Sequence, residues 1–166
     1  MPQEYDDDNG VQQETLQGRD WPCLRQFCVF MENRVGRLHE LLGKLERSDL
    51  KVVALSVVDT VDFAVARLIV DNTDLARDVL QLSQFTVIEN DILGVELPEG
   101  DQPFRQVLSA LVGAELNISY TYPLLYDRGG HHAIAIHVDN IDQATRILQG
   151  RGLHVLTEND LRQDMY

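Results

Sequence analysis

Four histidines lie in the last third of the 166-residue sequence, and histidine is the commonest metal ligand in proteins. In an extended strand, His131 and His137 would point to one side and His132 to the other. No adjacent pair then has the His-x-His spacing that places two ligands on one face. We interpret these residues and His154 as solvated or hydrogen-bonded histidines. The sequence predicts no metal site and no cofactor.

The tripeptide Glu-Asn-Asp occurs twice, at residues 89–91 and 158–160, and paired carboxylates could carry acid–base chemistry. Because both copies stand at the same place in a repeated pattern, we favour a structural role, in which each ends the last strand of its repeat. Cys23 and Cys28 match neither a redox Cys-x-x-Cys motif nor half of a zinc site, which predicts two reduced thiols. We find no nucleophile–His–Asp signature and no phosphate-binding glycine loop, so we expect a protein that is not an enzyme.

One segment, Asn-Arg-Val-Gly at residues 33–36, could bind a small zwitterion. Gly36 permits a tight turn, and the start of the following helix would offer the free N–H groups of Val35 to Leu38 to an anion. The side chain of Asn33 can accept a hydrogen bond from an ammonium group and donate one to a carboxylate. An amino acid carries both groups. The alternative is a simple strand-to-helix turn, in which asparagine occurs because its backbone conformational preferences suit a turn.

The elements that must position this segment occur twice. Residues 27–56 align without a gap on residues 93–122, and the apolar positions match more consistently than the identities do. This repeat predicts two domains, at residues 23–91 and 92–166. Domains of about 70 residues are marginally stable alone, so we expect the two to share a sheet, a core face or both.

Each repeat follows the order strand, helix, strand, strand, helix, strand. Alternating β-branched segments predict strands, and leucines at helical spacing predict helices, with Asn72 or Thr73 as the N-cap of one of them. The predicted strands are at 25–31, 50–59, 62–71, 85–89, 93–98, 117–126, 131–139 and 153–158, and the predicted helices at 37–47, 73–82, 103–114 and 141–150. The fold class is therefore α+β: two ferredoxin-like βαββαβ domains, each an antiparallel sheet with helices on one face. Side by side, they could form one continuous eight-stranded sheet.

Charge and composition exclude several function classes. The net charge of −13 repels nucleic-acid phosphates and anionic membranes, so we expect neither partner. Residues 1–22 are acidic, glutamine-rich and poor in apolar residues, which predicts a disordered tail. We find no apolar run of the length of a signal peptide or a membrane span, so we expect a cytoplasmic protein.

The segment "ENRVGRLHELLGKLERSDLKVVAL", at residues 32–55, resembles the signature of ACT domains. The resemblance implies a regulatory module that binds small ligands, typically amino acids, at interfaces between paired ACT units. Most ACT domains are appended to enzymes. Because we identify no catalytic domain, the resemblance implies a stand-alone allosteric sensor or a regulatory subunit.

The resemblance also implies a composite site. In the family, an asparagine at the start of the strand after the first helix often completes the site from the partner unit. The first repeat has Lys51 there and the second has Asn117. The second repeat instead has Glu99 where the first has Asn33, and this charge should repel a carboxylate. The predicted ligand-binding residues are Asn33, Arg34, Val35, Gly36, Arg37, Leu38 and Asn117.

We therefore predict a tandem ACT protein that binds a free amino acid and forms a homodimer with two-fold symmetry. The alternative is a regulatory subunit whose main partner is a catalytic protein, as in the small subunit of acetolactate synthase. That subunit is similar in length and begins with an ACT domain. Its second half, however, is not a clean ACT copy.

Overall fold

The computed structural model describes residues 21–163, so almost all of the predicted acidic tail lies outside the described range. The elements follow the predicted α+β order. They are β1 (Leu24–Glu32), α1 (Arg37–Arg47), β2 (Val52–Asp59), β3 (Phe63–Val70), α2 (Thr73–Gln81), β4 (Thr86–Glu96), α3 (Pro103–Val112), β5 (Ile118–Arg128), β6 (His131–Val138), α4 (Ile141–Gly150) and α5 (Glu158–Gln163).

The two repeats share one strand. The long strand β4 combines the last strand of the first repeat with the first strand of the second. It pairs with β1 from Thr86 to Ile92 and with β6, on its other edge, from Leu93 to Glu96. The sheet is therefore continuous, as expected, and antiparallel. It has six strands in the order β2-β3-β1-β4-β6-β5 in place of the expected eight.

The expected strand at residues 153–158 is reduced to a single bridge between Val155 and Val95. The reason is that most of this edge of β4 is already paired with another strand. Strand β1 occupies this edge of β4 as far as Ile92, so only the few residues beyond it are open to a new neighbour. The predicted domain boundary between residues 91 and 92 falls inside this shared strand. The division into two domains at that point remains a prediction.

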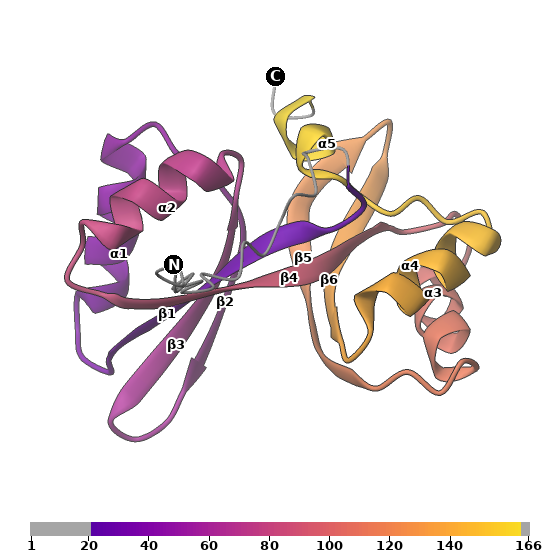
Figure 1. Cartoon of the computed structure of the whole chain (residues 1–166), viewed down its shortest axis with the longest axis horizontal. Coiled ribbons are helices and arrows are strands. Elements are labelled where there is room, and N and C mark those ends of the chain that lie inside the picture. Colours follow the sequence, from indigo (N-terminus) through magenta and orange to yellow (C-terminus); the bar gives the residue numbers. More distant parts are fainter. Residues whose placement is uncertain (1–20, 164–166) are drawn as a thin grey trace, which may run out of the picture.

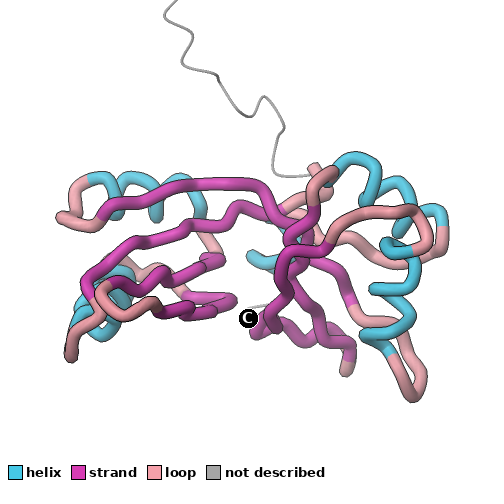
Figure 2. Tube along the Cα trace, turned by 90° about the horizontal axis from the view of Figure 1, so that it is seen from below, coloured by secondary structure: helices cyan, strands magenta, loops and turns pink. Residues whose placement is uncertain are grey.

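Each half of the sheet has its own pair of helices, on the outer side of the molecule (Figure 1). Helices α1 and α2 cover a core around Phe27 and Leu41, and α3 and α4 cover a core around Leu93 and Leu111. The inner faces of the two halves pack on each other through a third cluster, and the edge strands β2 and β5 are in contact. In Figure 2 the strands of the two halves meet in the middle of the molecule.

A polar residue lies within this inner interface. Gln26 on β1 is fully buried, and all of its side-chain partners come from β1, β4 and β5. Its amide nitrogen donates to Tyr120 Oη at 2.8 Å and to Asn90 Oδ1 at 2.9 Å, and its amide oxygen accepts from Tyr122 Oη. Because a buried amide without partners is costly, these bonds favour one docking of the two halves over others.

Helix α5 was not expected from the sequence, and it fastens the second repeat to the first. Thr73 Oγ1 at the start of α2 donates to Glu158 Oε1 at 3.0 Å, and Arg162 Nε donates to the backbone oxygen of Asp71 at 3.2 Å. Leu161 is buried in the inner cluster. The end of the second repeat is thereby fixed to the first helical layer.

Candidate functional site

The candidate loop, residues 33–36, joins β1 to α1. Gly36 is the N-cap of α1, with φ of 90°, in the left-handed region that favours glycine, and no side chain caps the helix. Among the described residues, the N–H groups of Val35, Gly36 and Leu38 donate to no protein acceptor. Val35 is fully exposed, whereas Leu38 packs against the core. The first turn of α1 thus retains donors that an anion could use.

Asn33 holds this loop against the turn between β2 and β3. Its backbone N–H donates to the oxygen of Asp62 at 3.0 Å, and its side-chain nitrogen donates to the oxygen of Thr60 at 3.2 Å. One amide donor is therefore in use. The amide oxygen and the second amide hydrogen have no partner within residues 21–163.

The two arginines of the loop already have carboxylate partners. Arg34 Nε lies 2.7 Å from Glu32 Oε2, and Arg37 Nη1 lies 2.7 Å from Glu40 Oε2. The Arg37 guanidinium also stacks over the ring of Phe85, 4.4 Å from its centroid. These ion pairs stabilise the local structure. In the described residues the polar groups left without a partner here are the backbone N–H groups, the Asn33 amide and the buried Nε of Arg37.

Asn117 lies in the other half of the molecule, exposed and directly before β5. β1 runs for nine residues from the junction of the halves to the candidate loop, a span of roughly 30 Å. Asn117, by contrast, lies near the junction of the halves. The next residue, Ile118, pairs with Val138, which is two residues from Ile136, where β6 pairs with β4. In the described part of one chain, no hydrogen bond or ring contact joins Asn117 to the loop. Figure 1 shows α1 and β5 in different halves.

The equivalent loop of the second repeat has different chemistry. It contains Glu99 and Asp101, and Glu99 Oε1 lies 3.7 Å from His131 Nε2. The N-cap of α3 is Gln102, which has an ordinary negative φ in place of the left-handed turn at Gly36. The geometry that leaves helix donors beside an asparagine therefore occurs only in the first repeat.

The histidines form no metal site in the described part of the chain, where no group of three or more His, Cys, Asp or Glu side chains could hold an ion. His132 Nδ1 lies 3.3 Å from the backbone oxygen of Tyr126, and the ring of His137 stacks on Tyr120 with centroids 4.8 Å apart. Burial, and after it the positive charge of Arg67, lowers the pKa of His137.

Neither cysteine forms a disulfide. Burial is the main cause that raises the pKa of Cys23 to about 12, and the negative charge of Asp91 adds to it. Burial also raises the pKa of Cys28. Thiols with raised pKa values stay protonated at neutral pH and are poor nucleophiles. They offer no basis for covalent chemistry.

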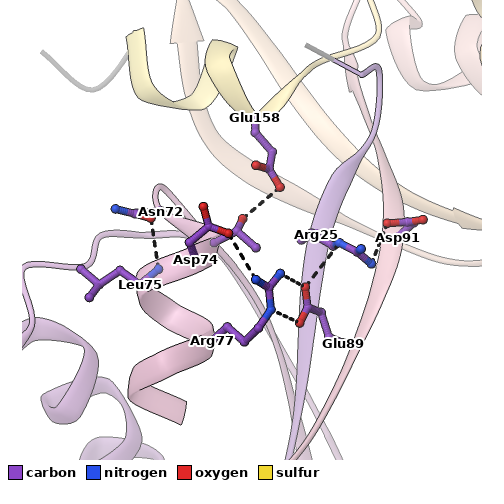
Figure 3. Close-up of polar contacts among 9 residues, drawn as sticks. Arg25, Asn72, Asp74, Leu75, Arg77, Glu89, Asp91 and Glu158 are labelled. Carbon is purple, nitrogen blue, oxygen red and sulfur yellow. Dashed lines mark hydrogen bonds and ion pairs between the residues drawn. The ribbon is translucent and has the colours of Figure 1, made fainter. Parts of the chain in front are cut away.

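The two Glu-Asn-Asp segments do not end strands, so that prediction is wrong. Residues 89–91 lie inside β4, because β4 continues into the second repeat. There, Glu89 accepts from Arg77 at 2.6 and 2.8 Å and lies 3.3 Å from Arg25, which also pairs with Asp91 at 2.9 Å (Figure 3). Residues 158–160 begin α5. The second segment joins the two halves through Glu158, which accepts from Thr73 Oγ1. The partners of Glu89 and Asp91 lie in the first repeat, where they fasten α2 and β1 to β4.

A family model described as an ACT domain pair matches residues 23–165. The chain belongs to the ACT domain pair family. This agrees with the order of elements in each half, with the helices on one face and with the glycine turn before α1. Every described strand and helix lies within the matched range.

Solved structures support the same fold for the ACT pair. Protein BT0572 from Bacteroides thetaiotaomicron is 26% identical, with a TM-score of 0.77 over 85% of this chain and 96% of that one. The regulatory subunit of aspartate kinase from Thermus thermophilus is 14% identical, with a TM-score of 0.56 over 80% and 95% of the two chains. That of Thermus flavus is 13% identical, with a TM-score of 0.50 over 77% and 92%. No curated protein matches the sequence.

The described residues include no helix that is long and apolar enough to span a membrane.

Proposed function

We propose that this ACT pair is a non-enzymatic regulatory protein that binds a free amino acid at the loop between β1 and α1. The observation that carries the proposal is the uncapped start of α1, where Gly36 turns free N–H groups toward solvent beside Asn33. The helix start suits the α-carboxylate, and the free amide oxygen of Asn33 suits the α-ammonium group. The ligand-binding residues proposed are Asn33, Arg34, Val35, Gly36, Arg37, Leu38 and Asn117.

The second part of the proposal is that Asn117 completes the site from another chain. Within one chain, β1 carries the loop away from the half that contains Asn117. A two-fold axis can bring the loop of one chain to Asn117 of its partner, and the reverse, which gives two equal sites per dimer. One ligand per chain is the expected stoichiometry.

An uncovered apolar sheet surface supports a homodimer. Leu24 and Gln26, at the start of β1, are buried on the side of the strand that faces the second repeat. Further along β1, the same side of the sheet is no longer covered by the second repeat. There it carries what we call the open face, which has exposed fractions from 37% to 59%. The open face consists of Phe30, Val58, Phe63 and Ile88, which strand register places on the same side of the sheet. A second copy is its proposed occupant, because the open face continues the interface that already joins the two halves.

Replacing Phe63 with aspartate is expected to convert the homodimer into a monomer. Phe63 is 59% exposed in the single chain, so the substitution should not disturb folding, whereas a carboxylate buried between two copies would be costly. Sedimentation velocity at micromolar concentration measures the mass. Leu82→Asp is the matched control, because Leu82 is 90% exposed at the end of α2, away from the open face. A monomeric wild type, or a dimer that survives Phe63→Asp, would contradict the proposed interface.

Asn33→Ala is expected to weaken amino-acid binding by about tenfold, the effect of losing one hydrogen bond to a charged group. A thermal-shift screen of the common amino acids identifies the ligand, and calorimetry then gives affinity and stoichiometry. Glu99→Ala is the control, because it changes the equivalent loop of the second repeat and should leave binding unchanged. If no amino acid raises the melting temperature, or if Asn33→Ala binds as tightly as the wild type, the loop is only a turn.

The second candidate function is a regulatory subunit of a biosynthetic enzyme. Two chains with this fold are named as regulatory subunits of aspartate kinase. Purification from the native source would distinguish the candidates: a stoichiometric catalytic partner would favour the subunit, and an isolated homodimer that binds an amino acid would favour the sensor.

A further inference from the structure

A surface pocket of about 430 Å³ lies on the helical side of the second repeat. It is formed by one face of α3 and by the segment that follows α4. Five of its six lining residues have polar side chains, which supply two guanidinium groups, two side-chain amides and a hydroxyl beside apolar surface. The lining residues are Gln102, Arg105, Gln106, Ser109, Arg151 and Leu153.

The two arginines of this pocket make no ion pair within the described part of the chain. Within residues 21–163, five of the nine other arginines have a carboxylate within 4 Å, and these are Arg25, Arg34, Arg37, Arg77 and Arg128. Two like charges that line one depression repel each other, and an anion between them would remove that repulsion.

The position of Arg105 is not explained by helix electrostatics. It lies in the first turn of α3, where the helix dipole favours negative side chains, and this turn contains no acidic residue. Arg151, by contrast, is the C-cap of α4, where a positive charge is favourable. The need to place both guanidinium groups at one pocket would account for Arg105.

We propose that this pocket binds a small multivalent oxyanion, such as a phosphorylated metabolite or a polycarboxylate. Arg105 and Arg151 would each donate paired hydrogen bonds to the ligand's oxygens. The amides of Gln102 and Gln106 and the hydroxyl of Ser109 can donate as neutral partners. The volume lies within the range of small-molecule sites.

The site belongs to the second repeat alone. At the offset of the repeats, the pocket residues on α3 correspond to positions of the first repeat that carry no arginine. These are Gly36, His39, Glu40 and Gly43. The oxyanion pocket is therefore separate from the amino-acid loop, and its existence does not depend on the function proposed above.

Calorimetry with pyrophosphate and with citrate at low ionic strength tests the proposal on the full chain. We expect binding of at least one of them, at one site per chain, and acetate should bind far more weakly. Arg105→Gln and Arg151→Gln should each weaken binding by about tenfold or more. Arg47→Gln removes the same charge from an exposed arginine at the end of α1, and it should leave the affinity nearly unchanged.

Whichever of the two probes binds more tightly distinguishes a phosphate ligand from a polycarboxylate. Because both pocket arginines are exposed, their variants should fold, and circular dichroism verifies this. Asn33→Ala should bind the oxyanion as well as the wild type does, which separates this site from the amino-acid loop. The proposal is overturned if neither probe binds, or if the Arg105→Gln/Arg151→Gln double variant binds as tightly as Arg47→Gln.

Discussion

Replacing Glu89 with alanine is expected to lower the free energy of unfolding by about 3 kcal/mol. Glu89 is the carboxylate that both Arg25 and Arg77 use, and the side chain of Arg25 is only 8% exposed. The hydrogen bonds that Arg77 donates to Glu89 are the main cause that raises the pKa of Arg77 above its ordinary value. Without Glu89, the nearly buried guanidinium of Arg25 would lose one of its carboxylate partners and, with it, part of the compensation for its desolvation.

Chemical denaturation monitored by circular dichroism measures this loss. Glu32→Ala is the matched control, because Glu32 forms an ion pair with Arg34 in which both side chains are more than 60% exposed. Exposed pairs contribute little, so the control should change stability by less than about 1 kcal/mol. Equal effects of the two substitutions would mean that the Glu89 network drawn in Figure 3 does not stabilise the packing of α2 and β1 on β4.

Gly94→Ala is expected to cost about 2–3 kcal/mol through overpacking. Gly94 lies in β4 where β1 ends and the segment around Val155 begins. An added Cβ would stand 2.5 Å from Leu24 Cδ1 and 3.2 Å from Leu156 Cβ, and both leucines are fully buried. Because neither side chain can move into solvent, the two neighbours of β4 would have to separate.

Thermal or chemical unfolding measures the effect of Gly94→Ala. Gly150→Ala serves as the control, because Gly150 ends α4 with nothing within 4 Å of an added Cβ. This control should be neutral or slightly stabilising. If Gly94→Ala is equally harmless, then the strand junction has more space than the packing of Leu24 and Leu156 indicates.

The local structure around the candidate loop could be predicted from the sequence, because the signals are local. Leucine spacing gave the limits of α1 at Arg37 and Arg47, and the structure has the same limits. Asn72 was one of two expected caps, and its side chain accepts from the N–H of Leu75. The turn at Gly36 could be expected because glycine, directly before a helix, readily adopts the positive φ that this turn has. The repeat itself, read from aligned apolar positions, predicted the βαββαβ order and the continuous sheet.

The tertiary structure alone decided how the two repeats combine. Alternation of side chains shows that a segment forms a strand, but it does not show which partner each strand edge receives. The sharing of β4 between the repeats therefore could not be predicted from the sequence. For the same reason, the sequence did not indicate that the sheet has six strands in place of eight, or that residues 89–91 lie inside a strand. The position of Asn117 relative to Asn33 depends on the same docking, because the two residues are far apart in sequence and each is fixed to its own half. Arg105 and Arg151 likewise meet at one pocket only because α3 and α4 pack together, a contact that no periodicity in the sequence encodes.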